Sequence, residues 1–345
     1  MDKSAGKLVS VIIPCRNEAG FIGKCLDSIL AQDFRVEKLE IIVVDGMSSD
    51  ASSSIVRNYQ GKYPQIRLLE NRNKIVPVAL NLGIQHAVGD VIIIMGAHTE
   101  YAHDYISQCV KTLETTGADN VGGPALTKAK SFIQQAIALA FKSPFGVGGA
   151  KSHRENYEGH VDTVTYGCYR RDTFEKIGLF DEELIRNQDD EFNLRLTRAG
   201  GKIWQSPLIR SWYYPRSSLK ALFKQYMQYG YWKVRVIQKH RLPASIRHII
   251  PGTFVGGLLF SGLLAIFLKP FRLIFILVAL SYLLGNLVAT TITCHKRSDW
   301  RYIPIMPIVF FMYHFSYGYG FIRGVIDFLI LKKSSGRGFT QISRR

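Results

Sequence analysis

The stretches VSVIIPCRNE (residues 9–18), EIIVVDGMSSD (residues 40–50) and VIIIMGAHTE (residues 91–100) decide the fold of this chain. Each is a short apolar run that turns abruptly polar, which is typical of a buried strand followed by a loop. Helical patterns separate the runs, and a weaker strand pattern lies before the third. This alternation predicts an α/β fold with a mostly parallel sheet flanked by helices. The expected helices cover residues 19–32, 49–63 and 77–87, and the weaker strand covers 66–69.

The ends of these strands are the expected ligand site, because open α/β sheets bind ligands outside the carboxyl ends of their strands. Those ends are residues 14–18, 45–50 and 96–100. Asp45 stands at one of them, where a carboxylate can accept hydrogen bonds from a base N–H or from ribose hydroxyls. The alternative is a helix N-cap, but Ser48 and its neighbours already provide that.

The sequence lacks the motifs of P-loop ATPases and of nicotinamide-dependent enzymes, which disfavours both classes. Gly20–Lys24 does not have the P-loop spacing, and Gly146–Gly149 is not a G-x-G-x-x-G motif after a strand. The five cysteines are odd in number and form no C-x-x-C pair, so neither a disulfide framework nor a zinc site is expected. The apolar run 9–14 is too short for a signal peptide. We therefore expect residues 1–215 to stay in the cytoplasm, with reduced thiols.

The net charge of +17 comes entirely from the last 130 residues. Residues 1–215 carry 25 basic and 25 acidic side chains, 216–247 carry 8 and none, and 248–345 carry 11 and 2. Basic residues beside long apolar runs favour a lipid bilayer over a nucleic acid as the partner. Each apolar run is long enough to cross roughly 30 Å of hydrocarbon. The runs cover residues 249–268, 273–294 and 302–322.

Residues 216–247 predict a basic, aromatic amphipathic helix, which we expect at the membrane surface. The alternative is a core helix with a solvated basic face. Three spans in 248–345 would place the C-terminal tail outside the cell, yet the basic tail favours the cytoplasm. Either the preference of basic residues for the cytoplasmic side does not hold here, or one apolar segment is re-entrant. The tail residues in question are Lys332, Lys333, Arg337, Arg344 and Arg345.

Taken in order, residues 9–18, Val43–Asp50, Asn81-x-Gly83 and Gly89-Asp90 resemble the nucleotide-binding half of family 2 glycosyltransferases with a GT-A fold. The later part of the chain resembles the same family, in particular its succinoglycan-biosynthesis type with a membrane tail. The resemblance implies a catalytic domain over 1–215, divided into a nucleotide-binding half (1–100) and an acceptor half (101–215). The later motifs are Gly178–Glu183, Asn187–Leu196, Gly200-Gly201 and Gln225–Lys233, together with Gly146–Gly149.

The resemblance also implies roles for individual residues. Asp189 would be the catalytic base, which takes a proton from an acceptor hydroxyl as that oxygen attacks the anomeric carbon and inverts it. The alternative for Asp189, Asp190 and Glu191 is a set of first-turn acids favoured by the helix dipole. Asp45 would hold the uracil of a UDP-sugar. The other nucleotide-sugar-binding residues would be Pro14, Glu18, Asn81 and Ala97, and those on the acceptor or diphosphate side Asp190, Arg195, Lys233 and Arg170.

The sequence departs from the family pattern at the third strand. The usual D-x-D or D-x-H is here Gly96-Ala-His98, so the first carboxylate is missing. His98 is the candidate ligand of a divalent metal, Mn²⁺ or Mg²⁺, with Glu100 or Asp90 as weaker partners. The alternative is a polar residue at a strand end. Gln188 also replaces a common Glu, and the Q-x-x-R-W motif of processive members is missing after Gln225.

These expectations combine into a membrane-anchored, inverting, non-processive glycosyltransferase of glycan or polysaccharide biosynthesis. It would move a sugar, glucose by resemblance, from a UDP-sugar to a saccharide on a polyprenyl diphosphate carrier. The cell membrane would hold several spans, with the catalytic domain in the cytoplasm. One alternative is a degenerate, non-catalytic nucleotide-sugar-binding membrane protein, which Gly96 and Gln188 favour. A small transporter is the other, but it requires buried charge within its spans.

Overall fold

The computed structural model describes residues 7–340, which divide into two compact units. The first unit runs to Lys128 and resumes over Lys151–Tyr214. The second comprises Ala129–Ala150 and the residues from Pro215 onward. The acceptor half expected over 101–215 is therefore interrupted, because residues 129–150 carry an apolar helix that is buried in the second unit. The tail residues Arg344 and Arg345 lie outside the described residues.

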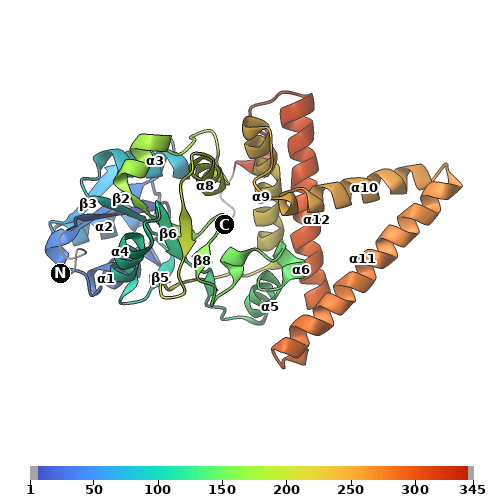
Figure 1. Cartoon of the computed structure of the whole chain (residues 1–345), viewed down its shortest axis with the longest axis horizontal. Helices are drawn as coiled ribbons and strands as arrows, with labels where there is room; N and C mark the ends of the chain where they lie inside the picture. Colours follow the sequence, from blue (N-terminus) through green and yellow to red (C-terminus); the bar gives the residue numbers. More distant parts are fainter. Residues whose placement is uncertain (1–6, 341–345) are drawn as a thin grey trace. The chain divides into compact units, whose positions relative to one another are not determined.

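The first unit is built on a large central sheet (Figure 1). The eight described strands of this sheet follow the order β3-β2-β1-β4-β9-β6-β10-β8. The four strands at the β3 end are parallel, and β9 runs antiparallel to both of its neighbours. A smaller sheet has the order β5-β11-β7. The strands are β1 (Val9–Cys15), β2 (Leu39–Asp45), β3 (Ile66–Glu70), β4 (Val91–Ile94), β5 (Thr99–Tyr101), β6 (Asn120–Gly123), β7 (Leu126–Thr127), β8 (Gly159–His160), β9 (Thr165–Arg170), β10 (Ile203–Gln205) and β11 (Ser211–Tyr213).

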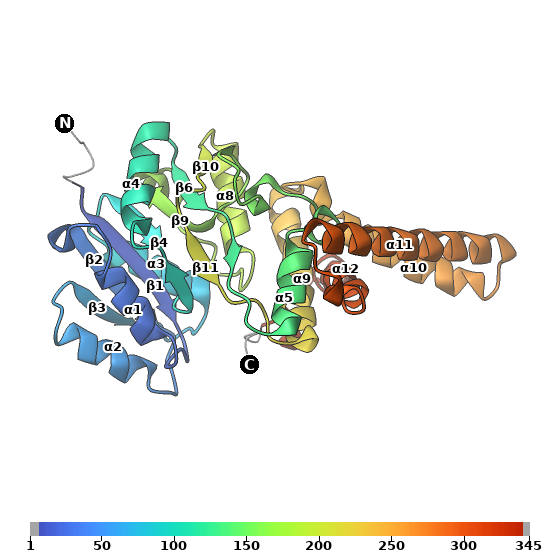
Figure 2. The ribbon, with the colours of Figure 1, turned by 90° about the horizontal axis from the view of Figure 1, so that it is seen from below.

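Helices cover both faces of the large sheet (Figures 1 and 2). Val11 and Ile13 of β1 pack with α1, α2 and α4, whereas Ile12 packs on the opposite face with α3, α7 and α8. This alternation follows from the two-residue period of a strand. The predicted α/β fold is confirmed. The helices are α1 (Ile22–Leu30), α2 (Ser52–Gln60), α3 (Val76–His86), α4 (Tyr105–Thr116), α7 (Arg171–Ile177) and α8 (Gln188–Arg198).

The second unit is helical in its described part. Its core joins Ile137 of α5 to Leu222 of α9 and to Phe310 and Tyr313 of α12. A capping box, formed by Ser131 and the third helical residue, starts α5. The helices are α5 (Phe132–Phe141), α6 (Pro144–Val147), α9 (Leu219–His240), α10 (Ile250–Ala265), α11 (Lys269–Lys296) and α12 (Met306–Gly324), with a π-helix over Val325–Ile330.

The helix expected at the membrane surface, α9, has its apolar face covered by α12 over much of its length. Two glycines let the backbones meet. A Cβ on Gly230 would lie 2.0 Å from the Tyr317 carbonyl oxygen, and one on Gly320 would lie 1.9 Å from that of Met227. Glycine is required at such close backbone contacts. The two helices therefore form one packed pair, and the place of α9 at the membrane surface stays a prediction.

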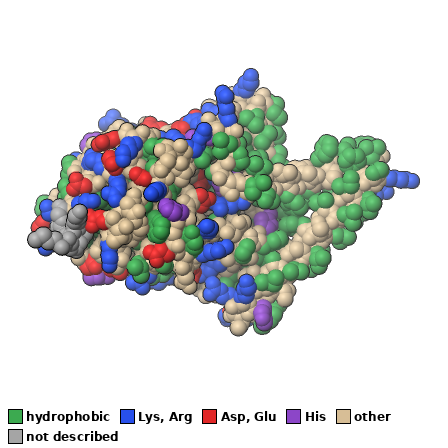
Figure 3. All heavy atoms as spheres, in the orientation of Figure 1, with side chains coloured by type: hydrophobic (Ala, Val, Ile, Leu, Met, Phe, Trp, Pro, Cys, Tyr) green, Lys and Arg blue, Asp and Glu red, His purple; other side chains and the backbone are tan. Residues whose placement is uncertain are grey.

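In the part of the chain that the structure describes, two of the three expected membrane spans are found as candidate spanning helices. The segments Ile246–Ala265 and Lys269–Lys296 are long and apolar enough to cross a bilayer, and little of either is buried. They form a hairpin that projects from α9 and α12 and carries exposed apolar side chains (Figures 1 and 3). The third expected span, 302–322, corresponds to α12. This helix is not apolar enough to count as a candidate span, because tyrosines, a serine and a histidine interrupt its apolar residues.

Candidate active site

The carboxyl ends of β1 and β2 lie side by side, as the parallel register requires. Cys15 is paired with Asp45, and the Gly46 N–H donates to the Cys15 carbonyl oxygen at 2.7 Å. Asp45 is only 4% exposed. Its carboxylate accepts from the backbone N–H of Ser48 at 2.9 Å and from the Ser48 hydroxyl. Asp45 therefore shapes the loop that follows β2, and lone pairs of its carboxylate remain for other donors.

The loop after β1 is tied to the loop after β2 through backbone N–H groups. Asn17 N–H donates to Ser48 Oγ at 2.8 Å, and Glu18 N–H donates to Ser52 Oγ at 2.7 Å. Asp50 accepts from Ala19 N–H and from Ser52. Slight burial raises the pKa of Asp50, but the hydrogen bonds from Ser52 and Ala19 outweigh it and hold that pKa below its usual value. The two loops thus form one hydrogen-bonded edge.

An acid–imidazole pair joins the third strand end to this edge. His98 Nδ1 lies 3.1 Å from Glu18 Oε1, and both side chains keep part of their surface exposed. Ala97 beside it is buried, and Pro14 within β1 is half-buried. The sequence predicts that the three strand ends converge, and the structure brings Pro14, Glu18, Asp45, Ala97 and His98 to one edge of the sheet. Their roles toward a nucleotide sugar stay predictions.

Tyr166 lies where a side chain at position 96 would begin, which is where the sequence lacks the usual carboxylate. A Cβ on Gly96 would lie 2.9 Å from the ring and from the hydroxyl oxygen of Tyr166. That hydroxyl is held by Thr99 Oγ1 at 2.6 Å, and the Gly96 N–H donates to Tyr101 Oη at 2.6 Å. The space in which a side chain at 96 would start is therefore filled. Tyr166, on β9, is a site residue that the sequence analysis missed.

Asp189 lies in the first turn of α8, two residues after the N-cap residue Asn187, whose φ of 61° is left-handed. Its side chain is exposed, and Oδ1 accepts from the Asp190 N–H at 2.9 Å. Burial raises the pKa of Tyr169, and the nearby Asp189 charge raises it further. Glu191, the third acid of this turn, is 3% exposed and bound by Arg195. The exposed Asp189 is thus distinct from the structural acid Glu191.

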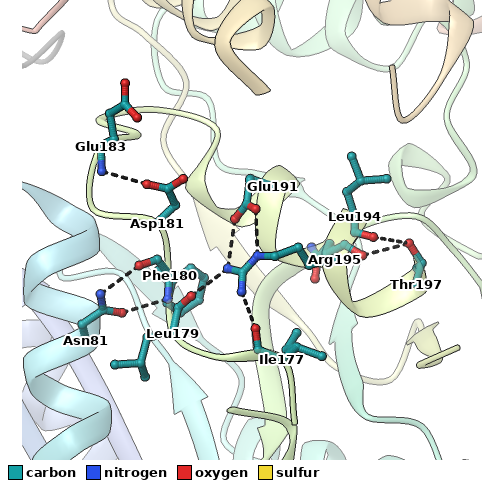
Figure 4. Close-up of polar contacts among 11 residues, drawn as sticks. Asn81, Ile177, Leu179, Phe180, Asp181, Glu183, Glu191, Leu194, Arg195 and Thr197 are labelled. Carbon is teal, nitrogen blue, oxygen red and sulfur yellow. Dashed lines mark hydrogen bonds and ion pairs between the residues drawn. The ribbon is translucent and has the colours of Figure 1, made fainter. Parts of the chain in front are cut away.

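Two residues expected at the donor or diphosphate contact the loop that leads into α8 (Figure 4). Asn81 binds both backbone groups of Phe180, with its amide oxygen and its amide nitrogen each at 2.9 Å. Arg195 donates to Glu191 through two nitrogens and to the carbonyl oxygens of Ile177 and Leu179. These contacts commit polar groups of both side chains to the loop, and contact of either residue with a ligand stays a prediction. We name Asn81 and Arg195 the loop clamp.

Other candidates lie elsewhere in the molecule. Lys233 is 4% exposed within α9 of the second unit. Arg170 donates to the Leu113 and Ala118 carbonyl oxygens. Asp90 precedes β4, at the opposite edge of the sheet from His98, and it accepts from the Leu8 N–H. Glu100 pairs with Lys128. Asp90 therefore lies away from His98, whereas Glu100 as a second metal ligand stays a prediction.

The chemistry of the remaining donors decides how a divalent metal fits. The described residues contain no group of three or more His, Cys, Asp and Glu side chains that could hold an ion. Glu18 and His98 together offer one carboxylate and one imidazole. Mn²⁺ tolerates this mixture better than Mg²⁺, which prefers oxygen. The pair fits an ion whose other ligands come from a bound diphosphate, and does not by itself complete a site.

Solved structures support the same fold. A mannosyltransferase of Pyrobaculum calidifontis, in complex with GDP-Man and Mn²⁺, has a TM-score of 0.56 at 21% identity, covering 89% of this chain and 86% of that one. TarS 1–349 of S. aureus, in complex with UDP-GlcNAc, has a TM-score of 0.53 at 14% identity, covering 92% of both. At these identities the likeness concerns the fold alone, which is of the GT-A type.

Sequence relatives carry the family assignment. The profile described as "Glycosyl transferase family 2" matches residues 10–178. A dolichyl N-acetyl-alpha-D-glucosaminyl phosphate 3-beta-D-2,3-diacetamido-2,3-dideoxy-beta-D-glucuronosyltransferase of Methanococcus voltae is 32% identical, over 92% of this chain and 97% of its own length. The succinoglycan biosynthesis protein ExoA of Rhizobium meliloti (strain 1021) is 30% identical over 92% and 95%. This chain therefore belongs to glycosyl transferase family 2 and is a glycosyltransferase.

Proposed function

We propose that this enzyme transfers a sugar from a UDP-sugar donor to a saccharide on a lipid carrier, with inversion at the anomeric carbon. The convergence of Glu18, Asp45 and His98 at one edge of the sheet carries the proposal. Asp45 and Pro14 would contact the uracil. A relative that acts on a dolichyl-linked sugar phosphate supports the lipid-linked acceptor. Glucose as the sugar transferred rests on the resemblance alone.

The exposed carboxylate of Asp189 is the proposed general base. It would accept the proton of the acceptor hydroxyl as that oxygen forms a bond to the anomeric carbon. The bond from that carbon to the diphosphate breaks in the same displacement, and UDP leaves. A single displacement inverts the centre, so an α-linked donor gives a β-glycoside. The loop clamp supports this role, because it fixes Leu179 and Phe180 at the start of the loop that leads into α8.

Glu18 and His98 would hold a divalent ion together with the oxygens of the donor diphosphate. When bound, such an ion neutralises charge that develops on the leaving diphosphate. Asp190, beside the base, is the proposed contact on the acceptor side. The contact between the Glu18 carboxylate and the His98 ring would also keep the loop after β1 close to the end of β4.

The second unit would place the enzyme at the membrane that holds the carrier lipid. The hairpin of α10 and α11 exposes large apolar side chains along both helices, among them Phe260, Leu263, Leu280 and Leu284. Burying this surface in lipid removes it from water, at about 25 cal/mol for each Å². We propose that the hairpin is the anchor, and that the catalytic unit faces the cytoplasm.

The test is release of UDP from the full chain in lipid, against a panel of UDP-sugars with a polyprenyl-linked acceptor. Asp189→Asn should lower kcat by at least about 100-fold, since general base catalysis contributes 10²–10⁴. Glu175→Gln is the matched control, because this exposed carboxylate on α7 lies beside Asp90, at the opposite edge of the sheet. Adding Mn²⁺ should raise the rate. Turnover that survives Asp189→Asn would refute the assignment of the base.

One outcome would favour the alternative. If UDP binds but no donor is turned over with any acceptor, the protein is a degenerate nucleotide-sugar-binding protein, and the filled space at Gly96 would be the structural reason.

A further inference from the structure

The position of α12 relative to the bilayer follows from its partner α9. The charges of α9 are spread along its length, at Lys220, Lys224, Lys233, Arg235 and Lys239. Its longest uncharged run has eight residues, or about 12 Å of helix, against roughly 30 Å of hydrocarbon. Crossing would bury several of these charges in lipid, at about 2.5–3.5 kcal/mol or more for each. We infer that α9 does not cross the membrane.

Contacts between α9 and α12 advance in the same direction along both helices. The rings of Tyr226 and Tyr313 lie 4.4 Å apart. Farther along, a Cβ on Gly324 would lie 3.1 Å from the Val234 side chain. The helices therefore run parallel and side by side, with backbones in contact at the glycines described above. A helix packed in this way along a non-crossing partner stays on the same side as that partner.

The chain beyond α12 returns to α9. The Tyr231 hydroxyl donates to Asp327 Oδ2 at 3.1 Å and accepts from the Gly336 N–H at 2.7 Å. The Tyr231 ring stacks on Phe339 at 3.9 Å, and Trp232 Nε1–H donates to the Phe339 carbonyl oxygen at 3.0 Å. These contacts are buried. Gly336 and Phe339 are therefore packed on α9, so residues 332–340 cannot lie across a bilayer from it.

The distribution of basic residues supports a hairpin that crosses the membrane with its base, where α10 begins and α11 ends, in the cytoplasm. Eight Lys and Arg residues flank this base, five between 233 and 249 and three between 295 and 302. The tip carries two, Lys269 and Arg272. Cytoplasmic flanks of spanning segments carry the excess of basic residues. The base is joined through α9 and Pro215 to the catalytic unit.

We propose that α10 and α11 are the only crossing helices among the described residues, with the tip at Lys269–Arg272 outside and residues 332–340 on the catalytic side. This rests on the membrane anchor proposed above. It also removes the conflict between three spans and a basic tail, because two crossings return the chain to the cytoplasm.

The test is cysteine labelling in spheroplasts that express the full chain, with a membrane-impermeant maleimide before and after permeabilisation. All five native cysteines are buried, so the background is low. Exposed positions for single additions are Pro270→Cys at the tip, Ser334→Cys beyond α12 and Ser54→Cys on α2. Pro270→Cys should label fully in intact spheroplasts. Ser334→Cys and the Ser54→Cys control should stay at background until the membrane is opened.

Each other result overturns the proposal. Labelling of Ser334→Cys in intact spheroplasts would show a third crossing. Pro270→Cys that labels only after permeabilisation would show a re-entrant hairpin. Release of the protein by alkaline carbonate would refute the membrane anchor itself, whereas UDP release that depends on Asp189 would still stand as a separate result.

Discussion

Gly96 shows how one residue changes the chemistry that a strand end can offer. Its missing side chain makes room for the Tyr166 ring, and the Tyr166 hydroxyl is held by Thr99. The departure from the family pattern is thus matched by a packing partner from β9. The consequence is that a carboxylate restored at position 96 would have to displace the Tyr166 ring.

We predict that Gly96→Asp lowers the free energy of unfolding of the first unit by about 1–3 kcal/mol, the usual cost of overpacking. Thermal unfolding of the detergent-solubilised protein would measure it. Gly96→Asp combined with Tyr166→Ala should recover part of the loss, because the contact at 2.9 Å disappears. Gly20→Asp is the matched control, since a Cβ at Gly20 has nothing within 4 Å. An unchanged melting temperature for Gly96→Asp would contradict the prediction.

The loop clamp offers a second test at the residue scale. Arg195→Lys cannot reproduce the fork of hydrogen bonds to Glu191 and two carbonyl oxygens. We expect a loss of about 1–3 kcal/mol, the cost of leaving buried polar groups unsatisfied. Activity should fall as well, because the loop before Asp189 loosens. Arg198→Lys, on the exposed side of the same helix, should change neither unfolding nor kcat.

Among the elements, the pair of α9 and α12 depends on glycine. Gly320→Ala would place a methyl group against the Met227 carbonyl oxygen, so the helices must separate. We predict that the second unit loses at least about 1–3 kcal/mol of stability, measured by thermal unfolding in detergent. Gly257→Ala in α10 is the control, because it has open space and alanine favours a helix. Equal effects of the two substitutions would show that close backbone approach is not what holds the pair.

The elements also show what the sequence could predict. The strand ends at Glu18, Asp45 and His98 were predictable, because parallel register brings the carboxyl ends of neighbouring strands together. Tyr166 was not, because β9 joins the sheet about 70 residues after β4. The role of Asn81 was also hidden, since hydrogen bonds to Phe180 span 99 residues of sequence. Helix periodicity likewise could not show that α12 would cover α9.

At the scale of the whole molecule, both units keep their thiols out of solvent. Burial raises the pKa of Cys25 to about 12, and the Glu18 charge adds to the effect. Native protein should therefore react negligibly with maleimide from pH 7 to 9, whereas five thiols should react after denaturation. Rapid labelling of native protein would contradict this prediction.

Cys25 binds its proton more tightly in the folded protein than in the unfolded one. The contribution of this thiol to the free energy of unfolding should therefore fall as pH rises above 9.0.

The insertion of residues 129–150 has a consequence for synthesis. Gln135 and Ile137 of α5 meet their partners Tyr302 and Tyr313 across 167 and 176 residues. At 5–20 residues per second, α5 emerges roughly 8–35 s before those partners exist. During that interval the part of its apolar face that α12 covers has no native neighbour. A nascent chain stalled near residue 248 should therefore be bound by chaperones that recognise apolar helices, and should be released once translation has passed α12.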